Sequence, residues 1–191
     1  MHTPIILIGA MSAGKSTIAA LLADKLGLPR LELDEKRMDY YQEAGYDEDR
    51  ASQIGRSEEG IIGLLRYWKP FEAYSVEQVV VDYKDYVIDF GAGHSVYEDE
   101  DLFWRVERAL APHPNVILLL PSPDLDKSVE ILNGRFRELL LREVGEVNEE
   151  LFEVNAHFVK HPSNQKLAKI VVFTEGKTPE ETCEEILGRL V

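Results

Sequence analysis

The sequence predicts an α/β fold of three layers, with a five-stranded parallel sheet flanked by helices. Short continuous apolar runs alternate along the chain with longer segments whose apolar residues recur at helical spacing. The first apolar run also passes through a glycine-rich turn directly into a helical segment. Continuous apolar runs are typical of parallel strands, because helices cover both faces of such a sheet. Each strand–helix–strand step is expected to be right-handed.

Five short apolar runs are the predicted strands. The first, IILI at 5–8, stops at Gly9 and is predicted to be the central strand. The second is LEL at 31–33, directly before Asp34. The others are YVIDF at 86–90, VILLL at 116–120 and IVVF at 170–173.

Segments with helical spacing lie between these strands. In residues 15–26 the apolar side chains Ile18, Leu21, Leu22 and Leu26 fall on one side of a helix, and the sequence GLP at 27–29 ends it. Further helices are predicted over residues 71–80, 99–110, 124–132, 149–159 and 180–190.

Composition limits the class of protein. The chain has 191 residues, of which 45% are hydrophobic and 29% charged, as in ordinary globular proteins. Its 21 basic and 35 acidic side chains give a net charge of −14, which disfavours nucleic acid as a partner. The apolar run near the N-terminus is too short for a signal peptide or a membrane span, and the single cysteine, Cys183, cannot form an intramolecular disulfide. We expect one soluble, cytoplasmic domain over residues 1–191, a monomer or weak homodimer.

Two polar stretches interrupt the regular pattern. Residues 39–63 are acidic and contain several glycines, and residues 133–148 combine arginines with two glycines. Such segments often cover a cleft. We therefore expect a substrate-binding insertion at about 35–70 and a mobile lid at about 133–148.

The sequence GAMSAGKST at 9–17, called the phosphate loop below, is the strongest functional motif. It has the spacing of a phosphate-binding loop and lies between a predicted strand and a predicted helix, as in the P-loop NTPase fold. Backbone amides and the helix N-terminus would surround the phosphates. The residues expected to bind the nucleotide are Gly9, Met11, Ser12, Ala13, Gly14, Lys15, Ser16 and Thr17.

Two side chains of this loop have expected roles with ATP and Mg²⁺. Lys15 is expected to reach the β- and γ-phosphates and to be catalytic, and the Ser16 hydroxyl is expected to bind the magnesium ion. The alternative is a simple glycine turn followed by a helix with a solvated lysine. The placement between strand and helix favours the ATP site.

Glu32 and Asp34 lie at the carboxyl end of the second predicted strand. Ligands of open α/β sheets bind beyond the carboxyl ends of the strands, so both carboxylates are expected to face the phosphate loop. Asp34 could accept the proton or hydrogen bond of an acceptor hydroxyl, and Glu32 could hold a magnesium-bound water. The alternative is that both are surface charges at a strand end.

These stretches resemble the shikimate kinase family of P-loop small-molecule kinases. The resemblance rests on IILIGAMSAGKSTIAALLADKLGL at 5–28 and LELDE at 31–35. It implies that Asp34 binds the substrate hydroxyls and that Glu32 lies near the metal. It also implies that Gly91, Ala92 and Gly93 contact the substrate, in place of the family's glycine triplet. His94, which follows them, could meet a phosphate or an acceptor group, or could simply be a helix-entry or solvated histidine.

The resemblance also implies three basic positions. An arginine that grips the substrate carboxylate would be Arg66 or Arg56. A lid arginine that closes over the transferred phosphoryl group would be Arg135 first, with Arg137 and Arg142 as alternatives, although the family's arginine-proline pair is absent. A later substrate-binding arginine falls at Lys160, which keeps the charge and loses the planar fork. Each could instead be a surface charge.

The segment TEGKTP at 174–179 joins the last strand to the last helix, where such kinases pack the adenine ring, so Pro179 is assigned to the ATP site. Thr178 and Pro179 also fit a helix start. Together these features predict an ATP-dependent phosphotransferase acting on a hydroxyl of a small metabolite. The alternatives are a nucleoside or nucleotide kinase and an ATP-binding regulatory protein.

Overall fold

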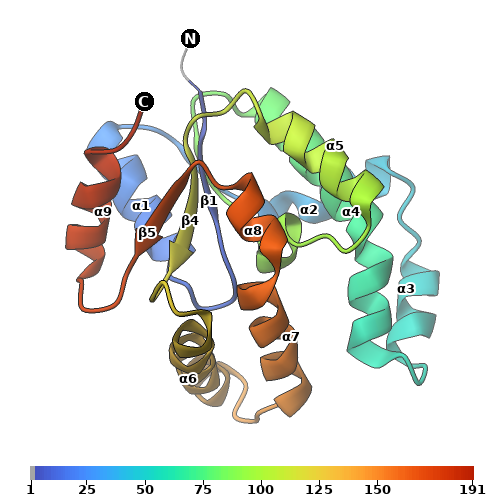
Figure 1. The fold of residues 1–191 in the computed structure, drawn as a ribbon. Coiled ribbons are helices and arrows are strands. Elements are labelled where there is room, and N and C mark those ends of the chain that lie inside the picture. Colours follow the sequence, from blue (N-terminus) through green and yellow to red (C-terminus); the bar gives the residue numbers. More distant parts are fainter. Residues whose placement is uncertain (1–2) are drawn as a thin grey trace.

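The structure, a computed structural model, describes residues 3–191 as a five-stranded parallel sheet with the strand order β2-β3-β1-β4-β5. The central strand β1 (Ile5–Ile8) lies between β3 (Val87–Asp89) and β4 (Val116–Leu120), as Figure 1 shows. The edge strands are β2 (Arg30–Glu32) and β5 (Ile170–Phe173). The predicted α/β fold and its central strand are confirmed.

Helices cover both faces of the sheet. The first face is covered by α1 (Lys15–Leu26) and α9 (Pro179–Leu187), which pack on each other. The other face is covered by α4 (Gly60–Asp82), α5 (Glu100–Leu110) and α8 (Pro162–Leu167). Strands β1 and β4 are buried along their whole length, which explains their lack of polar alternation.

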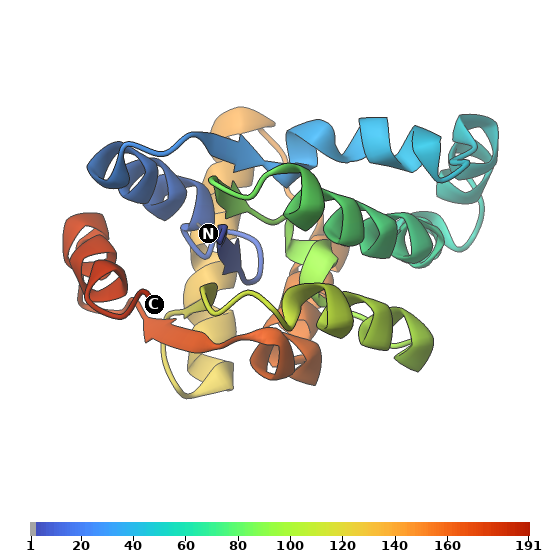
Figure 2. The same ribbon diagram turned by 90° about the horizontal axis from the view of Figure 1, so that it is seen from above.

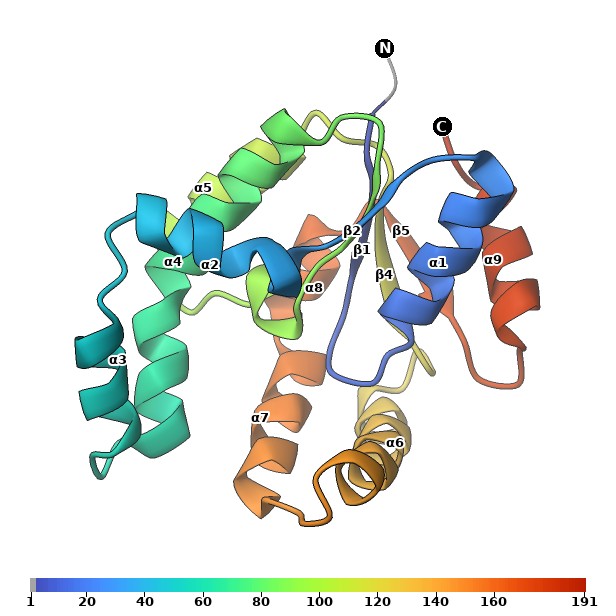
Figure 3. The same ribbon diagram turned by 180° about the vertical axis from the view of Figure 1, so that it is seen from behind.

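The remaining helices extend beyond the sheet. Helix α4 lies between α5 and α2 (Leu33–Glu43) (Figure 2), and α3 (Glu48–Gly55) packs beside its N-terminal half (Figure 3). Helices α6 (Leu125–Glu143) and α7 (Glu149–Lys160) pack on each other beyond the carboxyl ends of the strands (Figure 1). A 3-10 turn, η1 (Ala92–Ser95), follows β3.

Several predicted boundaries were wrong. Helix α4 starts at Gly60 and continues through Pro70, where the prediction began at residue 71. Helix α6 continues through Gly134 to Glu143, where the prediction ended at 132. Residues that disfavour helix, Pro70 and Gly134, suggested the predicted start of α4 and end of α6. Contacts of α4 with α2, α3 and α5, and of α6 with α7, stabilise the longer helices. Asp34 lies in the first turn of α2, because β2 already ends at Glu32.

The two polar stretches are therefore mostly helical. Residues 39–63 contain the end of α2, all of α3 and the start of α4, and α6 occupies 133–143. Whether either segment moves stays a prediction. None of the helices within residues 3–191 has the length and apolar character of a transmembrane span.

Candidate active site

The phosphate loop is held in an open turn between β1 and α1. Gly9 and Gly14 have φ values of 143° and 89°, and Ser12 has a φ of 60°. A Cβ atom on Gly9 would lie 2.9 Å from the carbonyl oxygen of Leu119, so β4 also requires glycine there. The first turn of α1 contains no acidic side chain. The helix N-terminus is therefore suited to an anion.

A buried carboxylate lies beside the end of this loop. The Ser16 hydroxyl donates to Asp89 Oδ2 at 2.5 Å, and Asp89 is only 5% exposed. Its other oxygen, Oδ1, has no hydrogen-bond partner within residues 3–191. Burial raises the pKa of Asp89, whereas Lys15 and the Ser16 hydroxyl act to lower it. An orphaned buried carboxylate oxygen next to a hydroxyl fits a hard divalent cation such as Mg²⁺.

Asp89 is a site residue that the sequence analysis missed. The sequence could have indicated Asp89 by its position near the end of the apolar run at 86–90, because that strand ends at the same sheet edge as the phosphate loop. The β2–β3 register places Glu32 directly opposite Asp89, so the predicted metal residue Glu32 lies on the adjacent strand end. Glu32 pairs with Arg30 at 2.7 Å.

Lys15 is folded back over its own loop. Its Nζ donates to the carbonyl oxygen of Ala10 at 3.1 Å. Burial lowers the pKa of Lys15, and the carboxylates of Asp89 and Asp34 act in the opposite direction. The ammonium group thus lies within the field of both carboxylates.

Two asparagines, of which Asn155 is the buried one, connect the phosphate loop to helices α6 and α7. The backbone N–H of Met11 donates to Asn155 Oδ1 at 2.9 Å, and Asn155 Nδ2 donates to Asn133 Oδ1 at 3.0 Å. Asn155 is fully buried. Asn155 of α7 therefore supports the loop backbone directly, and Asn133 of α6 does so through Asn155. Arg135, the first predicted lid arginine, lies two residues after Asn133 and is exposed.

Asp34 packs against the segment 91–93, called the glycine turn below. A Cβ atom on Gly91 would overlap the Asp34 carboxylate, so the close contact requires glycine. Arg37 Nη1 lies 3.8 Å and His94 Nδ1 3.9 Å from Asp34 Oδ1. His94 is 1% exposed, and neither ring nitrogen has a hydrogen-bond partner within residues 3–191. Burial lowers the pKa of His94, which favours the neutral ring.

The cation beside the glycine turn is Lys69, which the sequence analysis missed. Its Nζ donates to the Gly93 carbonyl oxygen at 2.9 Å and to Glu72 Oε2 at 2.7 Å, and both side chains are buried. A Cβ atom on Gly93 would overlap the Glu72 carboxylate. The sequence signal was a basic and an acidic residue three positions apart, a spacing that places them side by side on one face of a helix.

The other predicted basic residues lie apart from this turn. Arg56 is exposed at the C-terminal end of α3, and Arg66 pairs with Glu59 at 3.3 Å on the surface of α4. Lys160 pairs with Asp126 at 2.5 Å. Of the lid arginines, Arg137 pairs with Glu149 and Arg142 with Glu143. Pro179 is the first residue of α9, after the predicted N-cap Thr178.

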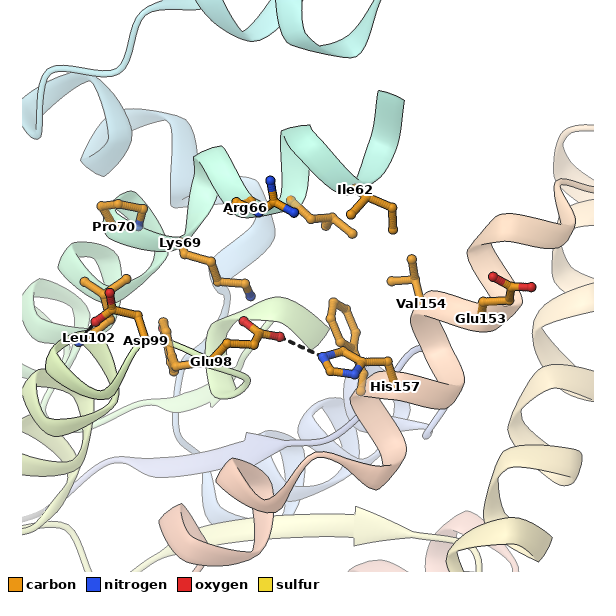
Figure 4. Close-up of a pocket in the computed structure, with 13 residues that line it drawn as sticks. Ile62, Arg66, Lys69, Pro70, Glu98, Asp99, Leu102, Glu153, Val154 and His157 are labelled. Carbon is orange, nitrogen blue, oxygen red and sulfur yellow. Dashed lines mark hydrogen bonds and ion pairs between the residues drawn. The ribbon is translucent and has the colours of Figure 1, made fainter. Parts of the chain in front are cut away.

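A cavity with a volume of about 670 Å³ lies between α4, α7 and the start of α5 (Figure 4). Lys69, Tyr97 and Phe158 contribute to its wall. No residue of the phosphate loop, the glycine turn or Asp34 lines this cavity within residues 3–191. Lys69 therefore touches both the cavity and the glycine turn.

No family model matches the chain. The sequence is 29% identical over 186 residues to the shikimate kinase of Persephonella marina, an alignment that covers 97% of this chain and 98% of that protein. The chain is thus similar to a shikimate kinase over nearly its whole length. The family resemblance stated from the phosphate loop and LELDE is thereby confirmed.

Solved structures of this family have the same fold. The shikimate kinase from Acinetobacter baumannii, solved with shikimate, matches with a TM-score of 0.65 and 20% identity, covering 99% of this chain and 93% of the other. The shikimate kinase from Bacteroides thetaiotaomicron matches with a TM-score of 0.58 and 19% identity over 99% and 98% of the two chains. At these identities the likeness concerns the fold, and the roles of individual residues stay predictions.

Proposed function

We propose that this shikimate kinase-like protein transfers a phosphoryl group from ATP, with Mg²⁺, to a hydroxyl of a small acidic metabolite. The observation that carries the proposal is the group formed by Lys15, Ser16 and Asp89 at one sheet edge, with Asp34 packed on the glycine turn beside it. The first group suits a metal-bound nucleotide, and Asp34 suits an acceptor hydroxyl. Shikimate is the first candidate acceptor, since relatives carry that activity in their names.

The ATP side uses residues of the phosphate loop and the adjacent strand ends. The loop amides and Lys15 would hold the phosphates, and Ser16, Asp89 and Glu32 would hold the metal through hard oxygen ligands. When bound, Mg²⁺-ATP supplies the transferable phosphoryl group and part of the charge neutralisation. Arg135 of α6 is proposed to neutralise charge on the transferring group, and Pro179 to border the adenine. Orientation and charge neutralisation are the main contributions of the protein in such reactions.

On the acceptor side, Asp34 would accept the hydrogen bond or the proton of the attacking hydroxyl. Lys69, whose ammonium has one donor left after Glu72 and Gly93, would attract an anionic group of the acceptor. Arg66 lines the same cavity as Lys69 and stays a candidate for binding the acceptor carboxylate, whereas Lys160 and Arg56 do not line that cavity. A lysine is a point charge without the planar fork of arginine, so it recognises a carboxylate with less geometric restriction. We therefore expect tolerance for more than one hydroxy acid.

An acceptor screen tests this function. Purified protein with Mg²⁺-ATP is incubated with shikimate, other polyhydroxy acids, nucleosides and nucleoside monophosphates, and ADP release is measured. We expect at least one hydroxy acid to raise the rate about 10-fold or more above the rate without acceptor, since well-positioned acceptors outcompete water. Stimulation by nucleosides alone, or ADP release that no added compound changes, would contradict the proposal.

Gly91→Ala should lower kcat about 10- to 100-fold, because the new methyl group displaces the Asp34 carboxylate and small misplacements of reacting groups are costly. Gly91 has an ordinary φ of −58°, and the Asp34 side chain is 58% exposed and free to move, so folding should change little. Steady-state kinetics and thermal melting measure the two effects.

Gly188→Ala is the matched control for this variant. Gly188 also has a negative φ, −69°, and a Cβ atom there would meet its nearest neighbour at 3.6 Å, an ordinary contact. This variant should keep the wild-type kcat. Equal kcat in Gly91→Ala and wild type would show that the contact between Asp34 and the glycine turn does not matter for the reaction.

A further inference from the structure

Two histidines and a glutamate meet outside the kinase site. His157 lies in the last turn of α7, and His161 lies four residues later, between α7 and α8. Glu98 lies in the segment between η1 and α5, and its Oε1 is 2.7 Å from His157 Nε2. The two imidazole rings have centroids 5.2 Å apart. One possible ligand atom from each of the three residues lies within 4.8 Å of the others.

We propose that Glu98, His157 and His161 form a binding site for a divalent transition-metal ion, of which Zn²⁺ is the representative. Two histidines four residues apart at a helix end can present their rings to one ion. Two imidazoles and one carboxylate are a ligand set that Zn²⁺ uses, with a fourth position open to water. Mg²⁺ prefers oxygen ligands, so the metal of the kinase reaction would not compete well here.

The charges around the three residues favour binding of a cation. The C-terminal end of α7 carries the partial negative charge of the helix, and the chain as a whole has a net charge of −14. Lys69 and Lys166 are the nearby positive charges that would repel a cation at this site. The charge of Lys69 is balanced by Glu72, and Lys166 is exposed on α8 with its ammonium over the Phe103 ring. Glu98 therefore supplies the negative charge that faces the two rings.

Metal binding requires two contacts of the present structure to change. The pair between Glu98 and His157 must open to admit the ion between them, and both side chains are about half exposed and able to move. His161 Nδ1 accepts a hydrogen bond from the Ser163 backbone N–H at 3.3 Å. Ligation through either ring nitrogen removes this acceptor, because the proton must occupy Nδ1 when Nε2 binds the metal. A hydrogen bond of this length is weak, so its loss is a small obstacle.

An ion at this site would connect two parts of the chain that are distant in sequence. Glu98 follows the glycine turn and η1, and the histidines end the helix that follows the lid segment. Glu98 and His157 face each other in the wall of the 670 Å³ cavity (Figure 4). The open coordination position is therefore available to water or to a molecule in that cavity. This site is independent of the proposed kinase function.

Calorimetric titration with Zn²⁺ in excess Mg²⁺ tests the proposal, on untagged protein freed of metal by a chelator. We expect one Zn²⁺ per chain and a raised Tm. Glu98→Gln, His157→Ala and His161→Ala should each weaken binding by at least about 10-fold, since even changes around the ligands of a metal site have effects of this size. The Co²⁺ complex of the wild type should show the absorption of a low-symmetry four- or five-coordinate ion.

His113→Ala is the control, because His113 lies in the loop before β4 and is not a member of the cluster. This variant should bind Zn²⁺ as the wild type does, and melting with chelator present should show that all variants fold. Three results would overturn the proposal: no Zn²⁺ binding, unchanged binding in both His157→Ala and His161→Ala, or an equal loss in His113→Ala.

Discussion

Lys15→Ala should reduce phosphoryl transfer by about 10²–10³-fold or more, the size of effect expected when one preorganised group that stabilises transition-state charge is removed. The Lys15 ammonium lies over the phosphate loop, where it donates to the Ala10 carbonyl oxygen and is in the field of Asp89 and Asp34. The measurement is kcat with the best acceptor, together with ATP affinity.

Lys25→Ala separates this effect from a general loss of positive charge. Lys25 lies in the same helix and pairs with Glu184 of α9 on the surface. Its removal should leave kcat unchanged and alter the thermal stability little, as is usual for an exposed ion pair. Both variants should have the wild-type far-UV circular dichroism. Full activity in Lys15→Ala would refute the assignment of the ATP site.

Asp34→Asn should lower kcat by about 10²–10⁴-fold, the range for loss of a positioned general base. The amide has nearly the shape of the carboxylate, so the packing against Gly91 is preserved while the negative charge and the ability to accept a proton are lost. ATP affinity should change little, because the proposed phosphate and metal ligands are other residues. The result separates the acceptor side of the site from the nucleotide side.

Asp39→Asn is the matched control for this variant. Asp39 lies in the same helix α2, is exposed, and pairs with Lys36 at 3.1 Å. Its substitution should leave both kcat and KM for the acceptor unchanged. If Asp34→Asn retained the wild-type kcat, Asp34 would not activate the hydroxyl, and another group near the glycine turn would have to do so.

The nucleotide side of the site could be predicted well from the sequence. The motif at 9–17 is contiguous, and the chain folds it between β1 and α1 as expected. Asp89, which we propose as a metal ligand, was missed because it comes from a strand 73 positions after its hydrogen-bond partner Ser16. Only the parallel pairing of β1 with β3 brings that carboxylate to the loop.

The acceptor side could be predicted only in part. Asp34 and the glycine turn were expected together, and they do pack on each other. The assignment of the carboxylate-binding arginine to Arg66 or Arg56 stays a prediction, and the cation that donates to Gly93 is Lys69. The rotation of a helix about its axis decides which of its side chains faces a neighbour, and helix α4 was longer than the sequence predicted. A three-residue difference along this helix places Arg66 on the surface and Lys69 in the interior.

The sequence by itself determined the layered α/β fold, the central strand and the phosphate loop. Each depends on local information: continuous apolar runs, helical spacing, and glycines followed by a lysine and a serine. The tertiary structure alone decided that Asp89 joins Ser16, that Lys69 joins the glycine turn, and that Glu98 meets His157 and His161. These groups come from elements far apart in the chain. Their meeting depends on how strands pair and helices pack, which no short segment encodes.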